Sequence, residues 1–219
     1  MTTILPADLI FTQAQPGSWI GDQIRWWTRT WNEPVTKVSH VGVAGSVVYG
    51  CLDMTKIIEM TSPEGREVNL LDYYGDQDIY VYRALCLQPW LRPDIVENMR
   101  ALIGKPYGYS KILLQLGDAA LGKLISATYV LPAKLFGVKL KGLEFPLLSR
   151  LNLIDAVVCS QAVARSYWNV AGMHFGGEWP SRNPDSMLDW VESRSDLWEK
   201  ILTIQKPQKR VLNAEKFSR

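Results

Sequence analysis

The chain has 219 residues, of which 47% are hydrophobic and 21% are charged. This balance is ordinary for a soluble globular protein and provides enough apolar surface for a sizeable core. The formal net charge of +2 gives no overall electrostatic reason to bind nucleic acid, so we expect no nucleic-acid partner. The longest apolar stretch, residues 112–138, is interrupted by charged residues and a proline, and it falls short of an uninterrupted membrane span.

In chain order, the predicted elements are strand, helix, several strands and then helices. β-branched and aromatic residues in near-alternating patterns, separated by Gly, Pro and Asp, predict strands over residues 8–13, 40–50, 56–61 and 78–84. Apolar residues at helical spacing predict helices over residues 18–32, 93–104 and 109–127. The order predicts an α+β fold in which an antiparallel β-sheet packs against helices.

A later helix is predicted where the apolar run "VV" is followed by "CSQAVARSYW", residues 159–168. Val163 and Tyr167 repeat at helical spacing, and Gly172 is a plausible residue to end the helix. Cys159 would then lie in the first turn, where unpaired backbone N–H groups and the positive end of the helix dipole favour a thiolate. The alternative is a buried thiol that packs as a small hydrophobic side chain.

Only two histidines are present, His40 and His174. His40 begins a predicted strand, and Glu59 lies on the next one. If those strands pair, the two side chains can lie across from each other on one face and form a hydrogen bond that fixes the imidazole tautomer. Cys159, His40 and Glu59 would then provide a nucleophile, a base and a residue that orients the base. His174, beyond the cysteine helix, is the alternative base.

Other chemical sites find less support in the sequence. The segment "GDAALGKL", residues 117–124, lacks the Ser or Thr that a phosphate loop uses to hold magnesium. The three cysteines and two histidines contain no close-spaced pair suited to structural zinc. We therefore expect no metal and no other cofactor.

The order of several segments resembles the circularly permuted branch of the NlpC/P60 papain-like superfamily, the YiiX/YebB-like amidases and peptidases. The segments that carry the resemblance are "DLIFTQ", "SHVGVAG", "IIEMTSPEGREVNLLDYY", "GKPYGY", "VVCSQAVARSYWNVAG" and, more weakly, "RNPDSMLDW". The resemblance implies a permuted papain-like fold in which Cys159 is the nucleophile, His40 the general base and Glu59 the third polar residue. It also implies that Tyr107 lines the site and assists at the oxyanion.

The expected activity is that of a cysteine hydrolase, a thiol peptidase or amidase that cleaves peptide or isopeptide bonds through an acyl-enzyme. The resemblance extends this to amides in cell-wall peptides. A first alternative uses the same site as a lipid acyltransferase or thioesterase, with transient membrane or lipid contact through residues 112–138. A second alternative is a non-catalytic binding module, for instance in a virus particle.

A single catalytic domain is expected over residues 1–200, with a helical apolar insertion at about 110–155 and a basic C-terminal tail over 201–219. The start of the chain lacks the basic and apolar regions of a secretory leader, so we expect a cytoplasmic protein with free thiols. The alternative is a phage-encoded or virion-associated protein. Cys51 and Cys86 lie in strand-like segments that are expected to bury them, which would leave Cys159 as the one activated thiol.

Overall fold

A computed structural model describes residues 3–13, 38–108, 158–177 and 183–205. The strands are β1 Leu9–Thr12, β2 His40–Ala44, β3 Lys56–Met60, β4 Gly65–Asn69, β5 Ile79–Ala84 and β6 Trp198–Ile204. The α-helices are α2 Leu70–Tyr74, α3 Arg92–Arg100, α5 Cys159–Ala171 and α6 Pro184–Ser193. Two short 3-10 turns, Leu52–Met54 and Pro89–Leu91, complete the elements of these ranges.

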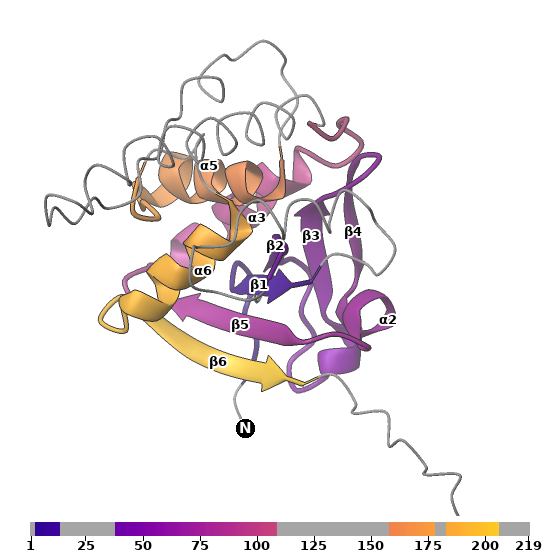
Figure 1. The fold of residues 1–219 in the computed structure, drawn as a ribbon, viewed down its shortest axis with the longest axis horizontal. Helices are drawn as coiled ribbons and strands as arrows, with labels where there is room; N and C mark the ends of the chain where they lie inside the picture. Colours follow the sequence, from indigo (N-terminus) through magenta and orange to yellow (C-terminus); the bar gives the residue numbers. More distant parts are fainter. Residues whose placement is uncertain (1–2, 14–37, 109–157, 178–182, 206–219) are drawn as a thin grey trace, which may run out of the picture.

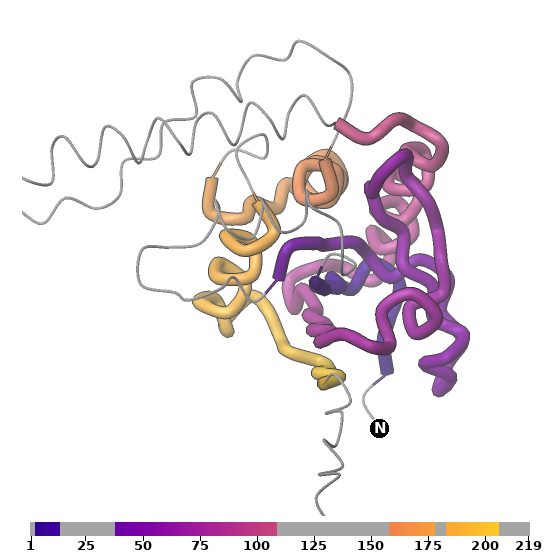
Figure 2. The backbone as a smooth tube through the Cα atoms, turned by 45° about the vertical axis from the view of Figure 1, so that its right-hand side comes forward, coloured from indigo at the N-terminus to yellow at the C-terminus, as the bar shows by residue number. Residues whose placement is uncertain are grey.

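The strands form one six-stranded sheet in the order β4-β3-β2-β1-β5-β6, and every neighbouring pair is antiparallel. Figure 1 shows α3, α5 and α6 gathered on one side of the strands, while α2 lies at the other end of the sheet. The turned view in Figure 2 shows α3 beside α5. The predicted α+β class, with an antiparallel sheet against helices, is therefore confirmed.

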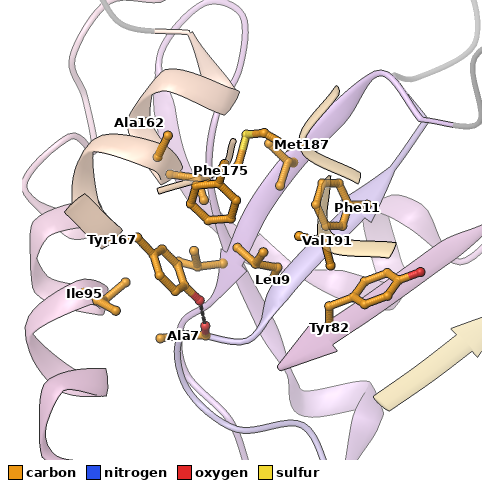
Figure 3. Close-up of a cluster of buried hydrophobic side chains, with 14 of the residues drawn as sticks. Ala7, Leu9, Phe11, Tyr82, Ile95, Ala162, Tyr167, Phe175, Met187 and Val191 are labelled. Atoms are coloured by element: carbon orange, nitrogen blue, oxygen red, sulfur yellow. Dashed lines mark hydrogen bonds between the residues drawn. The ribbon is translucent and has the colours of Figure 1, made fainter. Parts of the chain in front are cut away.

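The two faces of the sheet bury separate apolar clusters. Alternate residues such as Leu9, Phe11 and Val41 point toward α5, α3 and α6, and their neighbour Ile10 packs on the opposite face with α2. Figure 3 shows how the side chains of β1, α5 and α6 meet in the larger cluster, where the Tyr167 hydroxyl donates to the carbonyl oxygen of Ala7. This packing fixes α5 against the centre of the sheet.

A buried ion cluster holds the start of β1. The Asp8 carboxylate is fully buried and accepts hydrogen bonds from Arg83 at 2.6 and 3.0 Å and from Arg92 at 3.0 Å. Arg83 comes from β5 and Arg92 from α3, so one side chain ties three elements together. Removing one partner of such a buried cluster is strongly destabilising.

The predicted strands at 8–13, 40–50, 56–61 and 78–84 correspond to β1, β2, β3 and β5, and the helix at 93–104 corresponds to α3. Strands β4 and β6 were not predicted. Residues 201–204, expected in the basic tail, form the end of β6 instead, where Leu202 pairs with Val81.

Several other predictions lie outside the described residues. They are the helices at 18–32 and 109–127, the insertion at 110–155 with its lipid-contact segment 112–138, and the tail beyond residue 205. Within the described ranges, no helix combines the length and apolarity that crossing a membrane requires.

Candidate active site

Cys159 is the first residue of α5, as predicted. Val158 precedes it in extended conformation, and Gly172 ends the helix in the left-handed conformation, with a φ of 62° that suits glycine. Gly172 donates its N–H to the carbonyl oxygens of Trp168 and Tyr167, which closes the last turn. The cysteine therefore lies at the positive end of a thirteen-residue helix.

His40 and Glu59 are joined by a hydrogen bond of 2.8 Å between Nε2 and Oε2. The pairing of Val43 with Ile58 places Glu59 opposite Gly42, so His40 and Glu59 are diagonal neighbours on one face rather than directly opposite. Gly42 adds no side chain between them, and a Cβ there would lie 2.7 Å from the carbonyl oxygen of Ile58. Both side chains are nearly inaccessible, with 7% of the imidazole and none of the carboxylate exposed.

The thiol of Cys159 hydrogen-bonds to the side chain of His40. Since Glu59 occupies Nε2, the imidazole has Nδ1 left for the sulfur. The sulfur also takes hydrogen bonds from the backbone at Val41 and Ser160, and these lower its pKa, as expected of N–H donors to a thiolate. The structure therefore brings together Cys159, His40 and Glu59 from α5, β2 and β3.

The electrostatics of this trio favour a thiolate beside an imidazolium. Burial alone would lower the pKa of His40, but the Glu59 carboxylate and the Cys159 sulfur raise it to about 10. Burial would raise the pKa of Cys159, but the positive charge and hydrogen bond of His40 outweigh it and lower that pKa. The pair can therefore hold a proton on nitrogen and a negative charge on sulfur at neutral pH.

Two further residues contact Glu59, and neither was predicted from the sequence. Arg66 Nε donates to Oε1 at 2.8 Å, and the Tyr74 hydroxyl donates to Oε2 at 2.6 Å. Burial would raise the pKa of Glu59, but His40, Tyr74 and Arg66 together lower it. A sequence signal for Arg66 existed, because Glu59 and Arg66 are placed symmetrically about the turn "TSPE", residues 61–64, and form a cross-strand pair.

Tyr107 lies against the turn that connects β3 to β4, the strands that carry Glu59 and Arg66. Its backbone N–H donates to the carbonyl oxygen of Pro63, a residue of that turn. Its half-buried ring packs against the apolar cluster that includes Cys159. A role for its hydroxyl at the oxyanion stays a prediction.

His174, the alternative base, lies just beyond the far end of α5. His174 is exposed, and its ring contacts that of Trp168 in a tilted arrangement, with the ring centroids 4.1 Å apart and the ring planes at 40°. A thirteen-residue helix is about 20 Å long, so His174 is far from Cys159.

The environments of the other thiols differ from the prediction. Cys86 is exposed and Cys51 is half-buried, whereas Cys159 is buried. The expectation that Cys51 and Cys86 would be buried was wrong because both follow their strands into turns instead of continuing the ladder. Exposure alone therefore cannot single out Cys159, and any special reactivity must come from its charged neighbours.

Among the described residues, no group of three or more His, Cys, Asp or Glu side chains is arranged to hold a metal ion.

No protein-family model matches the chain, and no curated protein matches it. A solved structure described as the metalloprotein yiiX from Escherichia coli O157:H7 is similar, with a TM-score of 0.48 and 16% sequence identity. The match covers 94% of this chain and 91% of that chain. At this level of likeness, the papain-like and permuted assignments stay predictions from the sequence.

Proposed function

We propose that the chain is a cysteine hydrolase that cleaves amide bonds, in peptides or isopeptides, through an acyl-enzyme on Cys159. The observation that carries this proposal is the continuous set of contacts from Cys159 through His40 to Glu59, with the sulfur at a helix N-terminus. A nucleophile, a base and a residue orienting that base are the parts that thiol acyl transfer requires.

In the proposed reaction, the Cys159 thiolate attacks the carbonyl carbon of the amide and forms a tetrahedral intermediate. The backbone N–H of Cys159, at the first position of α5, has no acceptor within the helix and is suited to the oxyanion. His40 then gives its proton to the leaving nitrogen as the carbon–nitrogen bond breaks, which leaves a thioester and neutral His40. A water molecule loses a proton to His40 and attacks the thioester, releasing the acid and restoring the pair.

Within this class, we assign the chain to the circularly permuted papain-like group of the NlpC/P60 type. The support is the order of the segments, in which the histidine strand precedes the cysteine helix, together with the sequences that surround His40, Glu59 and Cys159. Amides of cell-wall peptides are the substrate class that this resemblance implies.

Intact-mass measurement after rapid acid quenching tests the proposal. The protein is mixed with a pool of peptide esters, isopeptides and acyl esters, and Cys159→Ala serves as the matched control. We expect an adduct with the mass of an acyl group, located on Cys159 by peptide mapping and absent in Cys159→Ala. An adduct found equally in both proteins, or none with any member of the pool, contradicts the proposal.

A further inference from the structure

A fully buried carboxylate with three side-chain donors is the feature that the proposed reaction leaves unexplained. Orienting His40 needs only one hydrogen bond, yet Glu59 also accepts from Arg66 at 2.8 Å and from Tyr74 at 2.6 Å. Of the three donors, Arg66 is the one that carries a permanent positive charge.

The elements around Glu59 are built to hold these two donors in place. Arg66 stands directly opposite Glu59 in the β3–β4 ladder, and the ring of Tyr73 lies 4.3 Å from the guanidinium carbon. Asn69 caps the short helix α2 by accepting from the backbone N–H groups of Leu71 and Asp72. That helix turns the chain back so that Tyr74 reaches the carboxylate and stacks near His40, with the rings 6.0 Å apart.

The charges of the site alternate along this line of contacts. Thiolate, imidazolium, carboxylate and guanidinium follow one another from Cys159 to Arg66, and together they cancel. Without the guanidinium, the set would carry a buried net negative charge, which disfavours the thiolate. The side chain of Arg66 is 29% exposed, so its charge is partly solvated while it neutralises a carboxylate with no exposure.

We propose that Arg66 is a positioning residue of this site, acting with Tyr74 to fix the Glu59 carboxylate and thereby keep the Cys159 thiolate and His40 imidazolium paired. The catalytic part of this role rests on the proposed function. The effect on the thiol itself does not, and it is measured without substrate.

The test follows the rate of Cys159 alkylation by iodoacetamide against pH, read by peptide mass spectrometry so that Cys86 and Cys51 are counted separately. Arg66→Met removes the charge, Arg66→Gln removes it while keeping a polar group, and Arg66→Lys restores it. Arg100→Met is the matched control, because Arg100 also pairs with carboxylates but contacts Glu67 and Glu97 instead of Glu59.

We expect Arg66→Met and Arg66→Gln to move the Cys159 profile upward by about one pH unit, which is about a tenfold slower reaction below the thiolate pKa. Arg66→Lys should recover most of the rate, and Arg100→Met should match the parent. Far-ultraviolet circular dichroism checks that each variant is folded. If Arg66→Met does not fold, the alkylation profile of Arg66→Gln decides the test, because a polar side chain is better tolerated on the edge strand β4.

A profile for the folded charge-removing variant that coincides with the parent overturns the positioning role, and so does an equal shift in Arg100→Met. Acyl-enzyme trapping on the same proteins separates this result from the proposed function. A shifted profile without an acyl-enzyme in the parent rejects the hydrolase and keeps the effect of Arg66 on the thiol. An acyl-enzyme in the parent together with an unshifted profile in the Arg66 variants keeps the hydrolase and rejects the effect of Arg66 on the thiol.

Discussion

Replacing Glu59 by Gln should strongly destabilise the fold, although the two side chains have nearly the same shape. The carboxylate is fully buried and accepts from three donors, and the amide of Gln turns one of its acceptor oxygens into a donor that faces other donors. Arg66 and a protonated His40 would also lose the anion between them. Breaking a buried pair in this way costs about 3–5 kcal/mol.

The matched control is Glu67→Gln, the same substitution on β4 at a carboxylate that is 19% exposed and pairs with Arg100 at 3.3 Å. A partly exposed ion pair near the surface contributes about 0–1 kcal/mol. Urea unfolding should therefore separate the two variants by about 2–5 kcal/mol, and melting should separate them by about 4–20 °C for a domain of this size. If Glu59→Gln is as stable as Glu67→Gln and leaves Cys159 alkylation unchanged, the reasoning about the buried carboxylate is wrong.

The remaining predictions concern the thiol, pH and packing. At about pH 6, His40→Ala should slow Cys159 alkylation at least tenfold while the exposed Cys86 keeps its rate, as peptide mapping will measure; equal rates for Cys159 in both proteins would exclude pairing. The pKa of His40 is raised to about 10 in the folded protein, so its contribution to stability is fully present below about pH 6.5 and is lost as the pH rises through 10. The pKa of Cys159 is lowered, so its contribution to stability is fully present above about pH 8.5 and is lost on acidification. Urea unfolding should therefore show a plateau of stability between about pH 6.5 and 8.5 and a fall toward pH 10. The same fall in the double variant that carries both His40→Ala and Cys159→Ala would refute this assignment. Asp8→Asn should lower the free energy of unfolding by about 3–5 kcal/mol in the same assay, yet leave the alkylation profile of Cys159 unchanged, because Asp8 belongs to a separate buried cluster. A shifted profile would argue against that separation. Gly42→Ala should lower the melting midpoint by an amount equivalent to about 1–3 kcal/mol, because its Cβ would press on a backbone oxygen, and an unchanged midpoint would contradict the close approach.

Local signals in the sequence were sufficient for the central strands and for the cysteine helix. Alternation of apolar residues marked β1 and β3, and helical spacing with Gly172 marked α5, because these patterns arise directly from backbone periodicity. Strand β6 was missed because Glu199, Lys200 and Thr203 make "WEKILTI" look like a polar tail, although its partner β5 is what makes it a strand.

The candidate site could be predicted only in part for a similar reason. Cysteine and histidine are scarce in the chain, and their order, with Glu59 on the strand predicted after His40, indicated Cys159, His40 and Glu59 before any fold was known. Arg66 and Tyr74 belong to residue types that are common on surfaces, and their role depends on a hairpin register and a five-residue helix. The cross-strand position of Arg66 could have been inferred from the residues on either side of the turn, whereas the contact of Tyr74 is set by tertiary packing that no local pattern encodes.

The ionisation of Cys159 in the folded protein tests the central claim most directly, because it needs neither substrate nor reagent access. The thiolate absorbance in the far ultraviolet is titrated for the parent, and the titration of Cys159→Ser is subtracted. The account predicts a thiolate signal already present at about pH 6, lost only on further acidification, and shifted upward in His40→Ala. A signal that first appears at about pH 8.5 or above, as for an ordinary cysteine, would contradict the thiolate–imidazolium pair and the hydrolase built on it.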